Sequence, residues 1–75
     1  MRPQAGDTVA LELPNGSVIR PRLVRDERGE DNHHRISIVN SPGIFVIDMA
    51  IGEEREVRMF GRPTRIKLLG IDRPE

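Results

Sequence analysis

Apolar and polar residues alternate along the first part of the chain. In residues 8–13, Val9, Leu11 and Leu13 fall in one phase, and the residues between them are small or polar. A period of two is typical of a strand with one buried face. The P-N-G-S sequence that follows contains Asn-Gly, which tolerates the positive φ angles of a tight hairpin. Residues 18–24 are the predicted second arm, and Pro21 within it predicts a sheet edge or a bulge because proline donates no ladder hydrogen bond.

Three further strands are predicted at residues 35–40, 55–60 and 64–71, and the last two form a closing hairpin around residues 61–63. Residues 25–34 contain no apolar residue, so we expect them to form an exposed, flexible loop. The apolar phases of the strands together predict the core. Its expected members are Val9, Leu11, Leu23, Ile36, Ile38, Val57, Met59, Ile66 and Leu68.

The segment that follows Ser41 admits two interpretations. Ser41 is a good helix N-cap and Pro42 suits the first helical position. The β-branched residues that follow favour a buried strand instead. Because Ile44, Ile47 and Ile51 fall near one face of a helix, we expect a short helix here. A central strand in a small all-β barrel is the alternative.

Length and composition indicate a single small domain over residues 1–75. Twelve basic and twelve acidic residues give no net charge, so the whole molecule is not drawn to nucleic acid or an anionic membrane. The absence of cysteine and of a secretion signal predicts a cytoplasmic location. No apolar run approaches the ~20 residues that a membrane-spanning helix needs.

Catalytic and metal-binding motifs are missing from the sequence. The adjacent His33 and His34 lack the spacing of metal ligands, and the acidic residues near them do not follow the order of a calcium loop. No serine lies in a G-x-S-x-G setting, and neither phosphate-binding glycine motif occurs. The sequence therefore predicts a protein without catalytic activity, bound metal or cofactor.

Residues 35–57, RISIVNSPGIFVIDMAIGEEREV, resemble a known family. An I-S-x-x-S-P step, a short apolar segment and a G-(D/E)-E step recur in the C-terminal domains of Gre transcript-cleavage elongation factors. The P-G-I and M-A-I-G-E-E steps also resemble FKBP-type prolyl isomerases, which share that fold. The resemblance implies an α+β, mostly β domain: a small FKBP-like antiparallel sheet with one short helix.

In the Gre family, the I-S-x-x-S-P turn docks on RNA polymerase. The matching positions are Ser37, Asn40, Ser41 and Pro42, with Ile44 beside them. The resemblance thus implies a non-catalytic protein-interaction module, a free-standing regulator that docks on bacterial RNA polymerase.

The two families' own activities are not expected here. Gre factors cleave RNA through carboxylates on a long N-terminal coiled coil, and only five residues precede Gly6 in this sequence. Prolyl isomerases line their pocket with several aromatic residues, and this chain has two Phe, no Tyr and no Trp. A degenerate prolyl isomerase is therefore the weaker alternative.

A basic stripe supports a different function. Arg20 and Arg22 share one face of the second arm, and Arg65 and Lys67 share one face of the last strand. If these strands are neighbours, the four cations could contact phosphates, as in a small nucleic-acid-binding β-barrel. No aromatic residue alternates with them to stack on bases. A protein partner is therefore preferred over nucleic acid.

Overall fold

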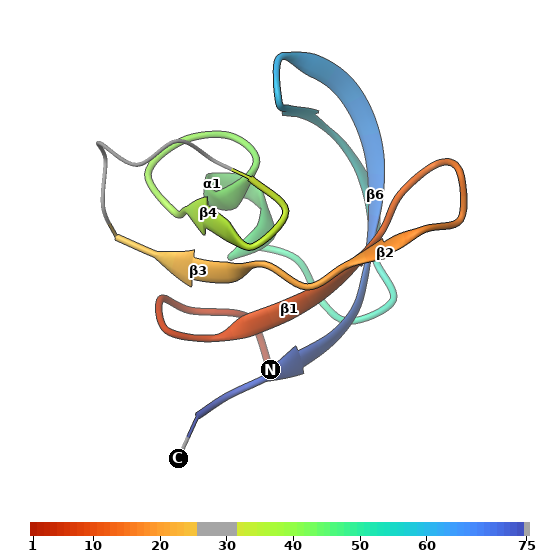
Figure 1. Cartoon of the computed structure of the whole chain (residues 1–75). Helices are drawn as coiled ribbons and strands as arrows, with labels where there is room; N and C mark the ends of the chain where they lie inside the picture. The colour runs from red at the N-terminus through yellow and green to blue at the C-terminus, as the bar shows by residue number, and fades with distance from the viewer. Residues whose placement is uncertain (26–31, 75) are drawn as a thin grey trace.

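The computed structural model describes residues 1–25 and 32–74, and its main feature is a strongly curled sheet with one short helix (Figure 1). The prediction of a mostly β domain with one short helix is confirmed. Within the described residues the elements are β1 (Thr8–Glu12), β2 (Val18–Ile19), β3 (Arg22–Val24), β4 (Arg35–Ser37), α1 (Gly43–Val46), β5 (Glu54–Met59) and β6 (Arg62–Asp72).

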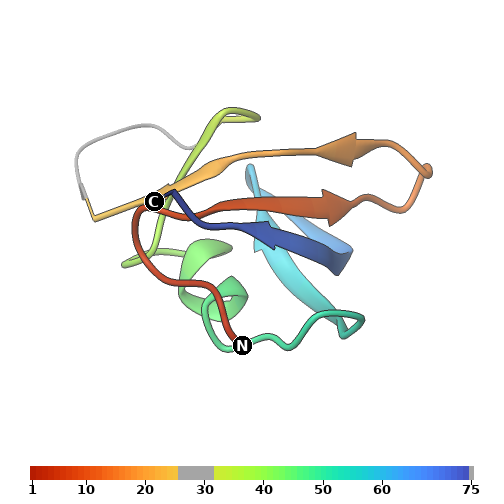
Figure 2. The same cartoon turned by 90° about the horizontal axis from the view of Figure 1, so that it is seen from below.

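The strand order is β4-β3-β1-β6-β5, and β2 also pairs with β1. Figure 2 shows β1 between β6 on one side and the β2 to β3 segment on the other. The long strand β6 pairs with β1 through its C-terminal half, from Lys67 to Asp72, and with β5 through residues 62–67. The strand thereby turns from one part of the sheet to the other, which curls the sheet into a half-barrel.

The sheet is not wholly antiparallel, and this corrects the predicted arrangement. Strands β3 and β4 are parallel, with Leu23 opposite Ile36. The Arg22 N–H donates to the His34 carbonyl, and the Ile38 N–H donates to the Val24 carbonyl, each at 2.8 Å. The sequence patterns gave no sign of a parallel pairing, because the partner of a strand is not encoded in its own alternation. The expected flexibility of that loop falls mainly on residues 26–31, which lie outside the described residues.

The first hairpin is confirmed. The Leu13 N–H donates to the Ser17 carbonyl at 2.8 Å, and Gly16 has a φ of 86°. Pro21 lies between β2 and β3, so the predicted interruption of the second arm is also confirmed.

The closing hairpin is tighter than predicted. Met59 pairs with Arg62, so the turn consists of Phe60 and Gly61 alone and Arg62 already belongs to β6. Both turn residues have positive φ, 51° and 83°. This geometry matches the twist of the flanking strands, as in type I′ turns.

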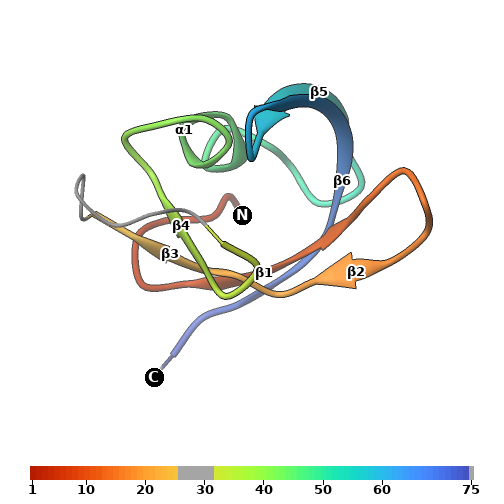
Figure 3. The ribbon, with the colours of Figure 1, turned by 45° about the horizontal axis from the view of Figure 1, so that its top comes forward.

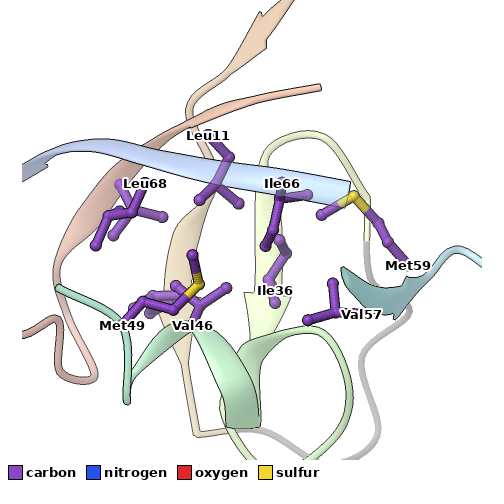
Figure 4. Close-up of a cluster of buried hydrophobic side chains, with 10 residues drawn as sticks. Leu11, Ile36, Val46, Met49, Val57, Met59, Ile66 and Leu68 are labelled. Carbon is purple, nitrogen blue, oxygen red and sulfur yellow. The ribbon is translucent and has the colours of Figure 1, made fainter. Parts of the chain in front are cut away.

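The core lies on the concave face of the sheet, where side chains from the strands meet side chains from the helical segment (Figure 4). Its buried apolar members are Val9, Leu11, Leu23, Ile36, Val46, Met49, Val57, Met59, Ile66 and Leu68. The strand phases predicted most of them. Ile38 was expected inside but is only partly buried, and Val46 and Met49 were not expected there.

Helix α1 is a single turn, shorter than the predicted segment, and the alternative of a central strand is wrong. Ser41 does not cap it, because its hydroxyl donates to the Arg58 carbonyl of β5. Gly43 and Val46 are its buried residues, and Figure 3 shows α1 between β4 and the hairpin of β5 and β6. Ile44 and Ile51, which were expected on the inner face, are 48% and 54% exposed.

A partly buried ion pair joins the two ends of the described chain. Asp7, only 1% exposed, accepts hydrogen bonds from Nε and Nη2 of Arg73 at 3.0 and 2.9 Å. It also accepts the Gln4 N–H at 2.9 Å. The Arg73 hydrogen bonds lower the pKa of Asp7, and they outweigh burial, which acts in the opposite direction.

We expect Asp7→Asn to lower the melting temperature by several degrees at neutral pH, because an uncharged amide with one acceptor oxygen replaces a carboxylate that accepts two charge-assisted hydrogen bonds from Arg73. A carboxyl whose pKa is lowered by folding contributes stability above its unfolded pKa, about 3.9, and loses it as the pH falls through the folded value. The difference in melting temperature between the parent and Asp7→Asn should therefore become smaller in acid. Melting curves from pH 7 to about pH 2 measure it. Glu56→Gln, at an exposed position of β5, is the control, and a gap that stays constant with pH would contradict the pairing.

Candidate functional site

An exposed apolar turn leads from β4 into α1. Three of its side chains, Val39, Ile44 and Phe45, are 41%, 48% and 43% exposed. Asn40 is exposed and Ser41 is partly exposed beside them. In a single-turn helix whose buried residues are Gly43 and Val46, Ile44 and Phe45 necessarily lie on the outer side. We call Val39, Asn40, Ser41, Ile44 and Phe45 the docking turn.

The structure separates the five predicted partner-binding residues into two groups. Asn40, Ser41 and Ile44 are accessible, whereas Ser37 and Pro42 are buried. The Ser37 hydroxyl accepts the Val39 N–H at 3.2 Å. Pro42 follows a cis peptide bond, and its carbonyl accepts the N–H groups of Phe45 and Val46, each at 3.0 Å. The buried pair therefore shapes the turn, and the accessible residues form its surface.

The docking turn is fixed to two strands. The Ser41 hydroxyl bonds to the Arg58 carbonyl, which ties the turn to β5. Gly43, two residues later, lies so close to β4 that a Cβ atom at this position would overlap the Ser37 carbonyl oxygen. Such anchoring leaves little backbone entropy to lose when a partner binds.

The basic stripe is interrupted by acidic side chains. The strand register places Lys67 opposite both Glu12 and Glu54, and Arg65 forms an ion pair with Glu54 at 3.7 Å. Arg22 lies farther along the sheet, opposite Thr8, which in turn pairs with Asp72. Arg20 lies near that end too, where it borders a hollow with Ala10 and Gly70. The four cations thus form two separate pairs, with carboxylates nearby, instead of a continuous positive band.

Residues 1–25 and 32–74 contain no cluster of three histidine, cysteine, aspartate or glutamate side chains that could hold a metal ion. The ring of His33 instead packs against Phe60, with centroids 5.4 Å apart. In the same parts of the chain, no helix has the length and apolar character that crossing a membrane requires.

Comparison of the sequence with protein-family models and with curated proteins gives no match to either. The likeness to Gre factors therefore remains an interpretation of the residues that carry it. Sequence reasoning also missed Val39 and Phe45 as parts of the exposed turn. An available signal was the apolar run from Ile44 to Ile47, because a single helical turn cannot bury four consecutive side chains on one face.

Proposed function

We propose that the protein is a non-catalytic interaction module that binds a protein partner through the docking turn. The observation that carries the proposal is the exposure of Val39, Ile44 and Phe45 on a turn fixed to both β4 and β5. Aliphatic and aromatic side chains that remain accessible on an anchored backbone suit the buried centre of an interface. Asn40 and the Ser41 backbone supply polar groups at its edge.

Bacterial RNA polymerase is the partner we propose, because the docking turn lies in the segment that resembles the I-S-x-x-S-P step of the Gre domain, with one extra residue before Ser41. In this proposal the protein acts as a free-standing regulator. The contact is mainly apolar, since no charged residue belongs to the docking turn.

Ile44→Asp should weaken binding to purified bacterial RNA polymerase about tenfold or more, because it places an unpaired charge in an apolar contact. Ile44 is about half exposed, so the variant should still fold, which a melting curve checks. Leu69→Asp is the matched control, because Leu69 is 38% exposed on β6, away from the docking turn. If both variants bind the polymerase as tightly as the parent, the docking turn is not the binding surface. If the parent itself does not bind, RNA polymerase is not the partner.

Arg20→Ser combined with Arg65→Ser tests the nucleic-acid alternative. We expect a small effect on binding to the protein partner, because Arg65 is already paired with Glu54. Binding through the docking turn should also persist as salt rises, whereas phosphate-driven binding falls steeply. If the two arginines prove essential while Ile44 is dispensable, the basic stripe takes the place of the docking turn.

A further inference from the structure

A hollow of about 530 Å³ lies between the tips of the two hairpins. Leu13, Pro14 and Asn15 line it from the first hairpin, and Met59, Phe60, Arg62 and Thr64 line it from the second, with His33 between them. Its size falls within the range of about 300–1,000 Å³ that is usual for small-molecule sites. None of these residues belongs to the docking turn.

The lining arises where the apolar phase of the strands runs past the core. Every second residue of β6 lies on the same face, and this face carries Ile66, Thr64 and Arg62 in order toward the hairpin tip. The buried face of β6 therefore becomes polar near the tip. Leu13 and Met59 mark the edge of the core on the two hairpins. The hollow therefore has an apolar floor and one arginine at its rim.

The described part of the rim carries charge of one sign. Of the residues that the structure describes, those lining the hollow include one arginine, Arg62, and no lysine or carboxylate. Within residues 1–25 and 32–74, Arg62 has no ion-pair partner. A ligand with an anionic group would give the guanidinium a charge-assisted hydrogen-bond acceptor.

Phe60 is a second, independent sign of a ligand. It has a φ of 51° in a two-residue turn, where Asn and Gly are strongly preferred. A non-glycine residue at positive φ is uncommon, and 42% of this aromatic side chain remains exposed. Its ring packs against His33 and forms part of the hollow's wall. Asn or Gly would suit the turn better than phenylalanine, whereas an exposed aromatic ring offers a face on which a flat ligand can stack.

We propose that this hollow binds a small organic anion with an aromatic body, whose ring stacks on Phe60 and whose carboxylate pairs with Arg62. The floor formed by Leu13, Pro14 and Met59 covers the apolar body. The proposed site is separate from the docking turn and does not depend on the partner that the docking turn binds.

The probe is 2-naphthoate, titrated into the ¹⁵N-labelled chain and followed by amide chemical shifts. We expect saturable shifts at Asn15, Phe60 and Arg62. The uncharged 2-naphthamide should bind about tenfold more weakly, because it lacks the charge that Arg62 recognises. Equal affinity for the two compounds would overturn the anionic requirement.

Two variants locate the site. Phe60→Asn should keep or raise the melting temperature, since Asn suits the turn, and should weaken 2-naphthoate binding about tenfold or more. Arg62→Gln should weaken 2-naphthoate but leave 2-naphthamide unchanged, and Arg58→Gln, an arginine of β5 outside the lining, should alter neither. Ile44→Asp should bind 2-naphthoate like the parent, which separates this site from the docking turn. Unchanged binding by Phe60→Asn would overturn the proposal.

Discussion

Gly43→Ala should destabilise the domain by at least about 3 kcal/mol, the upper end of the usual cost of overpacking. A Cβ atom at this position would overlap the Ser37 carbonyl oxygen and lie 2.7 Å from the Ser37 carbonyl carbon and 3.0 Å from Cγ2 of Ile36. The obstruction is mainly backbone, so no side-chain rotation relieves it. Strand β4 and helix α1 would have to separate. Chemical denaturation measured by circular dichroism gives the change in free energy.

Gly70→Ala is the matched control for that substitution. Gly70 lies in β6, and no neighbouring heavy atom comes within 4 Å of a Cβ atom placed there. Its φ is not positive, so alanine fits the backbone and should be neutral or slightly stabilising. If the two variants are equally stable, α1 does not pack on β4 as described. If Gly43→Ala still folds, displacement of Ile44 and Phe45 should also weaken binding through the docking turn.

The strand phases and the first hairpin could be predicted because their signals are local. The alternation that contains Val9 and Leu11 and the Asn-Gly turn depend only on neighbouring residues. Ile66 and Leu68 were predicted to be buried for the same reason. The boundary of the closing turn was harder to predict, because phenylalanine is not a residue that type I′ turns prefer at positive φ.

The inner face of the helical segment could not be predicted from helical periodicity. That periodicity favoured Ile44, Ile47 and Ile51, but α1 ends at Val46 and the chain then leaves the helix. Val46 and Met49 are buried instead, and Ile47 is partly buried. After α1 the chain continues in a tighter turn, in which the Met49 N–H donates to the Val46 carbonyl, three residues earlier, at 3.1 Å. A period of three residues gives a different inner face from a period of 3.6.

The accessible face of the candidate site also depends on contacts distant in sequence. Ser41 reads as a helix cap from its neighbours alone, yet its hydroxyl bonds to Arg58, 17 residues away. The parallel pairing of β3 with β4 is equally invisible to local patterns. These tertiary contacts decide which residues around Pro42 are exposed, and the family resemblance located the segment without resolving its two faces.

Leu68→Ala should cost about 2–5 kcal/mol, because the side chain is fully buried and its removal leaves a cavity. Leu68 lies opposite Leu11, in the same buried cluster as Met49, at the point where β6 turns from β1 toward β5, so the cavity would open where the two parts of the sheet meet (Figure 4). The Leu68 N–H also donates to the Glu53 carbonyl at 3.0 Å, which ties the start of β5 to this residue. In a domain of this size, a loss of about 1 kcal/mol lowers the melting temperature by about 4–8 °C.

Ile38→Ala is the informative comparison for Leu68→Ala. Ile38 is partly buried against the core, so its truncation removes less apolar surface from a protected position and should cost roughly half as much. Leu68→Met preserves the volume and should cost less than about 1.5 kcal/mol. Melting curves of the three variants should rank Leu68→Ala lowest and Leu68→Met highest. If Leu68→Ala has the melting temperature of the parent, Leu68 is not part of the core as described. If Ile38→Ala melts at a lower temperature than Leu68→Ala, the core is centred on β4 and the turn after it instead of on β6.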